Sequence, residues 1–300
     1  MFRSTGALVR DTLNAWIDDY APSMGAALAF YTIFSITPLL LIVISLAGLF
    51  FGEQAARGEI IAQLSDLLGP ESAKTVQNLL ESLNRPEAGA YGTVVGVGAL
   101  VVGATTVFVE LQDAMNRIWR APDVPAPGGI VQFFKSRLLS VGIVLGIVFL
   151  LMVSLVASAA LAALGKWWAP WFGEFARVAT VVDWALSFSL MTALFAMIYK
   201  WVPRVRVAWF DVMMGAALTA FLFTVGKFLI GLYIGRSGIA SPFGAAASLV
   251  VLLMWVYYSA QIFLLGAEFT WIYAHRHGSR KNTVPAVEAA VPHLNDRKPP

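Results

Sequence analysis

Six long apolar segments dominate the pattern of hydrophobic and polar positions in this 300-residue chain. A membrane-spanning α-helix needs about 20 mainly apolar residues, because each residue adds ~1.5 Å and the hydrocarbon core is about 30 Å thick. The short alternating segments of a membrane β-barrel are absent from the sequence. The pattern predicts an all-α fold, a polytopic membrane protein with a six-transmembrane-helix bundle over 25–274. The predicted spans are 25–51, 91–109, 138–164, 178–201, 210–234 and 245–273.

The region before the first span, 1–24, carries a different pattern. Its apolar residues recur at helical spacing on one face: Val9, Leu13, Trp16, Ile17 and Tyr20. One apolar face on a short charged helix is typical of a helix that lies in the membrane interface. The sequence therefore predicts an amphipathic interfacial helix over 6–20. No long apolar core precedes residue 25, so a cleavable signal peptide is not expected.

The segment 53–85, after the first span, contains two short apolar stripes separated by Gly69 and Pro70. Glycine suits the end of one helix and proline suits the first position of the next. We therefore expect an external helical hairpin that caps the bundle. The last region, 275–300, is polar and contains prolines, and we expect it to be disordered. The stripe residues are Ile60, Ile61, Leu64, Leu67 and Leu68, then Val76, Leu79, Leu80 and Leu83.

Composition strengthens the membrane assignment. The chain is 58% hydrophobic and 13% charged, whereas soluble domains carry about 25% charged residues. It has no cysteine, which excludes disulfides, thiolate metal sites and a cysteine nucleophile. Fourteen of the 21 Lys and Arg residues flank one side of the predicted bundle and six flank the other. By the positive-inside rule, both termini are expected in the cytoplasm.

Four ionisable residues lie in or at the ends of the predicted spans. A charge near mid-helix costs ~2.5–3.5 kcal/mol on insertion scales, so such residues are usually paired or functional. Steps of 100° per residue place Glu268 on one face with Gln261 and Tyr257, and its predicted depth matches that of Glu110. We predict an inner-side polar site of Glu110, Glu268, Gln261 and Tyr257, with Glu268 facing the bundle within reach of the second helix. The alternative is that both glutamates only anchor helix ends at the interface.

The other two charges, Asp183 and Lys227, share a predicted depth near the outer face, and we predict an outer ion pair. The alternatives are a gate, a purely structural pair, or two residues that reach the interface separately. Pro38 lies within the first span and is expected to kink it. A stripe of small residues in the second span is expected to allow close helix packing. That stripe comprises Gly92, Gly96, Ala99, Gly103 and Thr106.

Three stretches of the chain carry a family resemblance. They are ALAFYTIFSITPLLLIVISLAGLFFG (27–52), VFVELQDAMNRIW (107–119) and LLMWVYYSAQIFLLGAEFTWIY (252–273). They resemble the YihY/BrkB family of bacterial inner-membrane proteins, and the resemblance covers about residues 15–275. The family implies six helices in the cytoplasmic membrane, and transport has been suggested for it. Some members have carried the name ribonuclease BN.

The residues argue against a ribonuclease. Metal-dependent hydrolysis needs clustered ligands, and the three histidines, His275, His277 and His293, all follow the last span. We expect no enzymatic activity, no metal, no cofactor and no nucleic-acid partner. Two hypotheses remain: a transporter, ion-coupled or for an envelope or amphipathic solute, and a non-catalytic scaffold or envelope-integrity factor. The expected partners are the lipid bilayer and either a second copy or an envelope protein. MGAALAF (24–30) and MGAALTAF (214–221) echo each other, as in a remnant repeat.

Overall fold

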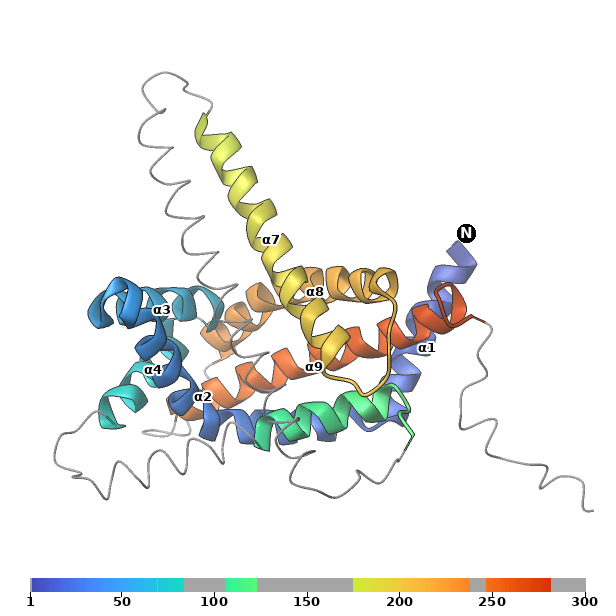
Figure 1. The fold of residues 1–300 in the computed structure, drawn as a ribbon, viewed down its shortest axis with the longest axis horizontal. Helices are drawn as coiled ribbons and strands as arrows, with labels where there is room; N and C mark the ends of the chain where they lie inside the picture. Colours follow the sequence, from blue (N-terminus) through green and yellow to red (C-terminus); the bar gives the residue numbers. More distant parts are fainter. Residues whose placement is uncertain (1, 69, 84–105, 123–174, 238–246, 282–300) are drawn as a thin grey trace, which may run out of the picture.

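The computed structural model describes residues 2–68, 70–83, 106–122, 175–237 and 247–281 (Figure 1). All regular elements in these ranges are helices, which confirms the all-α class. The helices are α1 (Phe2–Asp18), α2 (Ala21–Phe51), α3 (Glu53–Leu68), α4 (Pro70–Leu83), the segment 106–118, α7 (Phe175–Trp201), α8 (Trp209–Ser237) and α9 (Ala247–Arg276). The predicted and observed bounds of α1 to α4 and α7 to α9 agree to within a few residues, but the helical segment 106–118 continues well past 109, the predicted end of its span.

Two of the described helices are long and apolar enough to cross a membrane by length and composition. They are Trp209–Tyr233 within α8 and Leu249–Arg276 within α9, and Ala21–Ile36 forms a shorter apolar helix. The predicted span 138–164 and most of the span 91–109 lie outside the described residues. The number of six spans therefore stays a prediction.

Helix α9 is the central element of the described bundle. It packs against α1, α2, α4 and α8, while α7 packs against α8. In Figure 1 α9 (orange to red) runs through the middle of the molecule, and the first part of α7 extends away from the other labelled helices. In this arrangement the residues of α9 from Gln261 to Ala274 are buried or half-buried.

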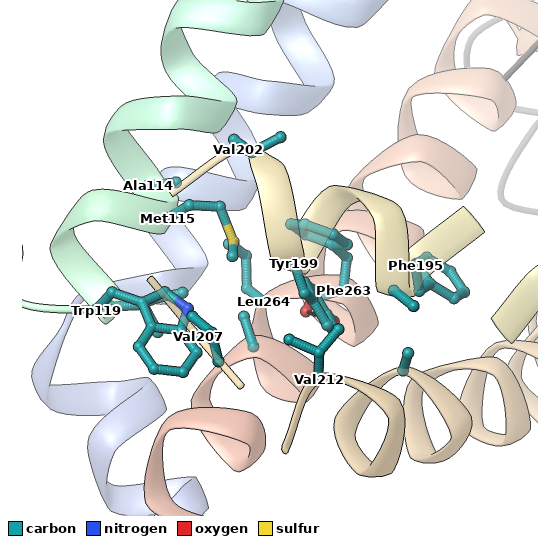
Figure 2. Packing of buried hydrophobic residues seen from close by; sticks show 14 of the residues in the cluster. Ala114, Met115, Trp119, Phe195, Tyr199, Val202, Val207, Val212, Phe263 and Leu264 are labelled. Carbon is teal, nitrogen blue, oxygen red and sulfur yellow. Dashed lines mark hydrogen bonds between the residues drawn. The ribbon is translucent and has the colours of Figure 1, made fainter. Parts of the chain in front are cut away.

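The larger apolar cluster joins α9 to the segment 106–118 and to the chain between α7 and α8. In Figure 2 the side chains of Met115, Leu264 and Val207 fill the space between Trp119 and Tyr199. Trp119 and Tyr199 are 2% and 0% exposed, so the two large rings are fully enclosed. This cluster fixes the C-terminal half of α9, which carries Glu268.

The hairpin region forms the second apolar cluster, at the opposite end of α9. Helix α4 begins at Pro70, as the proline signal predicts. Val76 and Leu80 of α4 are buried against Leu252 and Trp255 of α9 and against residues of α2. Figure 1 shows α3 and α4 at one end of α9 and α1 at the other. The hairpin thus packs on the bundle, and its location outside the membrane stays a prediction.

Helices α8 and α9 approach each other closely through a reciprocal pair of glycines. A Cβ atom on Gly215 would overlap the hydroxyl of Thr270, and a Cβ on Gly266 would overlap the hydroxyl of Thr219. The hydroxyl of Tyr199 on α7 lies 2.9 Å from that of Thr219 and donates to the carbonyl of Phe263 at 2.7 Å. Small residues with bridging hydroxyls are a usual way to pack helices in a membrane.

The end of α9 differs from what the sequence predicts. Residues 277–281, assigned to a disordered tail, fold back on the first turn of α8. Asp211, which is 1% exposed, accepts hydrogen bonds from the Ser279 amide at 3.1 Å and hydroxyl at 2.6 Å. A buried carboxylate that accepts two hydrogen bonds holds the turn in place. No local signal in the polar tail reveals this contact.

Candidate functional site

The polar edge that the sequence predicts on α9 faces the junction between α1 and α2. We call this junction, residues 19–25, the elbow. Tyr20 adopts a left-handed conformation (φ 58°), which lets α1 end and α2 begin within a few residues. The Gln261 side-chain amide donates to the Pro22 carbonyl at 3.5 Å, and Gly25 leaves room for that amide. The elbow and α9 are therefore in direct contact.

About two turns further along α9, Glu268 meets the same elbow. Its side chain is 0% exposed. Neither of its oxygens receives a hydrogen bond within the described part of the chain, and one oxygen of Asp19 is in the same condition. The carboxyl of Asp19 and the guanidinium of Arg120 are both close enough to Glu268 to act on it electrostatically. The site thus consists of two acids and one base, which we call the elbow site.

The charges of the elbow site do not balance. Two ionised carboxylates in contact repel, and neither can donate a hydrogen bond to the other. One proton shared between them removes the repulsion and supplies the missing donor. The charge that remains on the pair is then matched by Arg120. One shared proton is therefore a way to satisfy the elbow site, and it would belong to the pair rather than to one residue.

Arg120 reaches this site from an unusual backbone position. It follows the helical segment 106–118 with φ 47°, in the left-handed region where helix ends usually carry glycine. The Ala121 amide donates to the Asn116 carbonyl at 2.9 Å, which closes the helix end. An arginine there costs about 1 kcal/mol relative to glycine. Its guanidinium lies 4.2 Å from the centre of the Trp271 ring, beside Glu268 on α9.

A second contact fastens α1 to α9. Arg276 forms an ion pair with Asp11. Asp11 precedes Asp19 by eight residues, and Arg276 follows Glu268 on α9 by eight residues. Leu8 and Thr12 of α1 are buried on the same side. Helix α1 therefore covers the last turns of α9, and its end places Asp19 over Glu268.

The other members of the predicted inner-side site differ from Glu268 in exposure. Tyr257 is 37% exposed and Gln261 is half-buried, so of the polar edge only Glu268 is buried. Glu110 is half-buried in the segment 106–118. Asp19 and Arg120 act on Glu268 electrostatically, and the predicted place of Glu110 beside Glu268 stays a prediction.

The remaining predicted residues are described only in part. Lys227 is exposed on α8, and Asp183 lies in α7 with its side chain outside the described set, so their ion pair stays a prediction. Pro38 lies within α2, which runs from Ala21 to Phe51, and its kink stays a prediction. Of the small-residue stripe, Thr106 is half-buried at the start of the segment 106–118. The other stripe residues, Gly92, Gly96, Ala99 and Gly103, lie outside the described residues.

Sequence reasoning missed Asp19 and Arg120 as members of the site. Helical angles relate residues on one helix, whereas these two come from the ends of two other helical segments. A signal for Asp19 was nevertheless present. Asp18 and Asp19 stand at the end of an amphipathic helix, where a negative charge interacts unfavourably with the helix dipole. Helix stability therefore does not account for these two acids.

Within the described ranges, no group of three or more His, Asp or Glu side chains is placed to hold a metal ion. Hard cations such as Ca²⁺ take six to eight oxygen ligands. The donor set at the elbow site fits a proton better than a metal.

Comparison with known proteins supports the family resemblance. The family model described as "Virulence factor BrkB" matches residues 12–290. This chain belongs to the BrkB family. The match confirms the resemblance that the three sequence stretches indicate. No solved structure matches the chain.

Several curated relatives of this BrkB-family chain are named membrane proteins. It is 28% identical over 257 residues to a UPF0761 membrane protein of Pseudomonas aeruginosa PAO1, covering 85% of this chain and 59% of the relative. It is 29% identical to one of Tolumonas auensis, covering 84% and 80%, and 30% identical to one of Alkalilimnicola ehrlichii, covering 82% and 53%. The chain thus spans about three fifths of the length of the first of these relatives. Their names assign a membrane location and no activity.

Proposed function

We propose that this chain is a proton-coupled transporter of the bacterial inner membrane, in which Asp19 and Glu268 share the coupling proton. The observation that carries the proposal is the enclosed carboxyl of Glu268, which faces a second carboxyl and has no donor among the described residues. Helix stability does not favour such a pair, because two buried acids repel when both are ionised. A carrier uses such a pair, because it can gain and lose one proton.

A proton suits this site better than a metal cation. Two carboxyls provide few ligands for a metal, and the positive charge of Arg120 repels one. A proton needs only the two oxygens. Loss of the proton leaves two negative charges against one positive charge, which pushes Asp19 away from Glu268.

Repulsion between Asp19 and Glu268 would move the elbow, because Asp19 is part of it. Glu268 is closed off in this structure, so proton exchange requires the elbow to move away from α9. Gln261 contacts the same elbow through Pro22. Movement of Asp19 would therefore be passed to the first turn of α2, the helix that contains Pro38. The proposed outer pair of Asp183 and Lys227 would serve as the opposite gate.

Flux measurements on reconstituted protein test the proposal. Vesicles with an internal pH-sensitive dye are presented with a panel of charged, neutral and amphipathic solutes. The wild type should change internal pH when its solute is added, and Glu268→Gln and Asp19→Asn should not. Tyr257→Phe, on the exposed part of the same helix, is the matched control and should behave as wild type. If the wild type matches empty vesicles across the panel, proton coupling is wrong.

A scaffold role is the second candidate, and the α3–α4 hairpin favours it. The face of α4 opposite Val76 and Leu80 is polar and exposed, with the Gln77 amide 3.0 Å from the Glu81 carboxylate. This surface is available to an envelope protein. A photo-cross-linker at Lys74 should capture one defined partner in cells if the scaffold role holds. A matched cross-linker at Gly58 on α3, which is also exposed, shows whether capture depends on position.

A further inference from the structure

Helix α1 presents three different faces. Leu8 and Thr12 are buried against the protein, and Asp19 continues that side toward Glu268. A second face is apolar and exposed: Val9, Leu13 and Ile17 are 53%, 46% and 60% exposed, and Tyr20, just after the end of the helix, is 63% exposed. A third face is polar and exposed, and it carries Arg10, Asn14 and Asp18. A helix between only protein and water would need no apolar outer face.

The charges around the apolar face indicate what covers it. Arg10 lies beside Val9 on the neighbouring polar face, and the guanidinium of Arg117 lies 5.3 Å from the centre of the Tyr20 ring. Basic groups at both ends of an apolar stripe complement a surface with acyl chains below and phosphates above. A phospholipid leaflet has that surface. In addition, α1 packs at the end of α9, one of the two described helices able to cross a membrane.

We propose that the Val9, Leu13, Ile17 and Tyr20 face of α1 docks into a phospholipid leaflet at the boundary between headgroups and acyl chains, and that the leaflet thereby holds Asp19 over Glu268. The docking itself does not depend on proton transport. Because Asp11 and Asp19 both contact α9, a helix held by the leaflet on its outer side closes the elbow site on its inner side. Anionic lipid should strengthen the closure through Arg10 and Arg117.

The first test reads the environment of single residues, because the chain has no native cysteine. Leu13→Cys and Asn14→Cys are labelled with an environment-sensitive fluorophore and reconstituted in vesicles of phosphatidylcholine and phosphatidylglycerol. Quenchers attached to lipid acyl chains should quench the label at position 13, and iodide in water should quench the label at position 14. Equal quenching of both by iodide overturns the docking. Protection of position 13 from both quenchers, as by a second copy or another segment, overturns it too.

The second test asks whether the leaflet keeps α1 closed. Thr12→Cys places a thiol on the buried face, where a water-soluble maleimide should react slowly. Adding Leu13→Ser and Ile17→Ser should raise that reaction rate several-fold, and removing phosphatidylglycerol should raise it less. The matched control, Asn14→Ser in the same background, should leave the rate unchanged. An unchanged rate with the serine pair overturns the closing role. Both tests are independent of transport, so their failure is distinct from failure of the proposed function.

Discussion

Two contacts made by α9 differ in how their polar groups are satisfied. Where α9 meets α8, the hydroxyls of Thr219 and Thr270 donate to helix carbonyls at 2.8 Å and 2.6 Å and occupy space left by glycines. Where α9 meets the elbow, Glu268 is as deeply buried but receives no hydrogen bond from a described residue. The same helix therefore has one side built for close packing and another that retains an unsatisfied acid.

The side of α9 that faces α8 therefore serves stability, and the side that faces the elbow serves the proposed function. Close contacts with satisfied hydroxyls lower the free energy of the folded bundle, and disturbing them should unfold it. An unsatisfied buried acid raises the free energy of the folded state, and removing its charge should not unfold the protein. Substitutions on the two sides should therefore have opposite effects.

The largest expected loss of stability comes from Gly215→Val, because its side chain would overlap Thr270. Overpacking costs about 1–3 kcal/mol, and each kcal/mol is worth about 2–4 °C in a chain of this size. The apparent melting temperature, followed by intrinsic tryptophan fluorescence in detergent, should fall by roughly 5–10 °C. Gly231→Val on the same helix is the matched control, because nothing lies within 4 Å of a Cβ there. Equal losses for both variants would remove the argument for close α8–α9 packing.

A smaller loss is expected for Tyr199→Phe. The substitution removes the hydroxyl that donates to the Phe263 carbonyl and contacts Thr219, without changing the shape of the ring. A buried hydrogen bond contributes about 0.5–1.5 kcal/mol, so the melting temperature should fall by roughly 2–5 °C. Tyr257→Phe, at the exposed end of the polar edge of α9, should change the melting temperature by no more than about 1 °C. Similar falls for both tyrosines would contradict the distinction.

The smallest effect on stability, and of opposite sign, is expected at the elbow site. Glu268→Gln and Asp19→Asn each replace one acid by an amide of similar shape, which can donate to the remaining carboxylate. The melting temperature should stay unchanged or rise, because one buried charge and its repulsion are removed. Thermal melts of both variants beside Tyr199→Phe give the comparison. A fall as large as that of Tyr199→Phe would show that the ionised pair stabilises the fold.

Much of this arrangement follows from sequence patterns, and the rest depends on contacts between helices. The 100° rule places Gln261 and Glu268 on one side of α9, and both contact the elbow. The apolar stripe of α1 and the Gly69-Pro70 break between α3 and α4 were readable in the same way. Periodicity within one helix cannot choose the partner helix. It therefore gave no reason to name Asp19 and Arg120, which act on Glu268 in the structure.

Glycines show the same limit. The sequence analysis took the small residues of 92–106 as a packing stripe, and nearly all of them lie outside the described residues. The close approach that the structure describes uses Gly215 and Gly266, which no stripe marks. In both MGAALAF and MGAALTAF the glycine leaves room for a side chain of α9, Gln261 at Gly25 and Thr270 at Gly215, while the repeat itself stays a prediction. Position in three dimensions, rather than local spacing, decides which small residues matter.

Infrared spectroscopy tests the shared proton most directly. In lipid vesicles at neutral pH, the wild type should show the C=O stretching band of a protonated carboxyl. Both Glu268→Gln and Asp19→Asn should lose that band, because the carboxylate left in each variant gains an amide donor and keeps Arg120 nearby. A wild-type spectrum without such a band, or a band that survives both substitutions, would contradict the account.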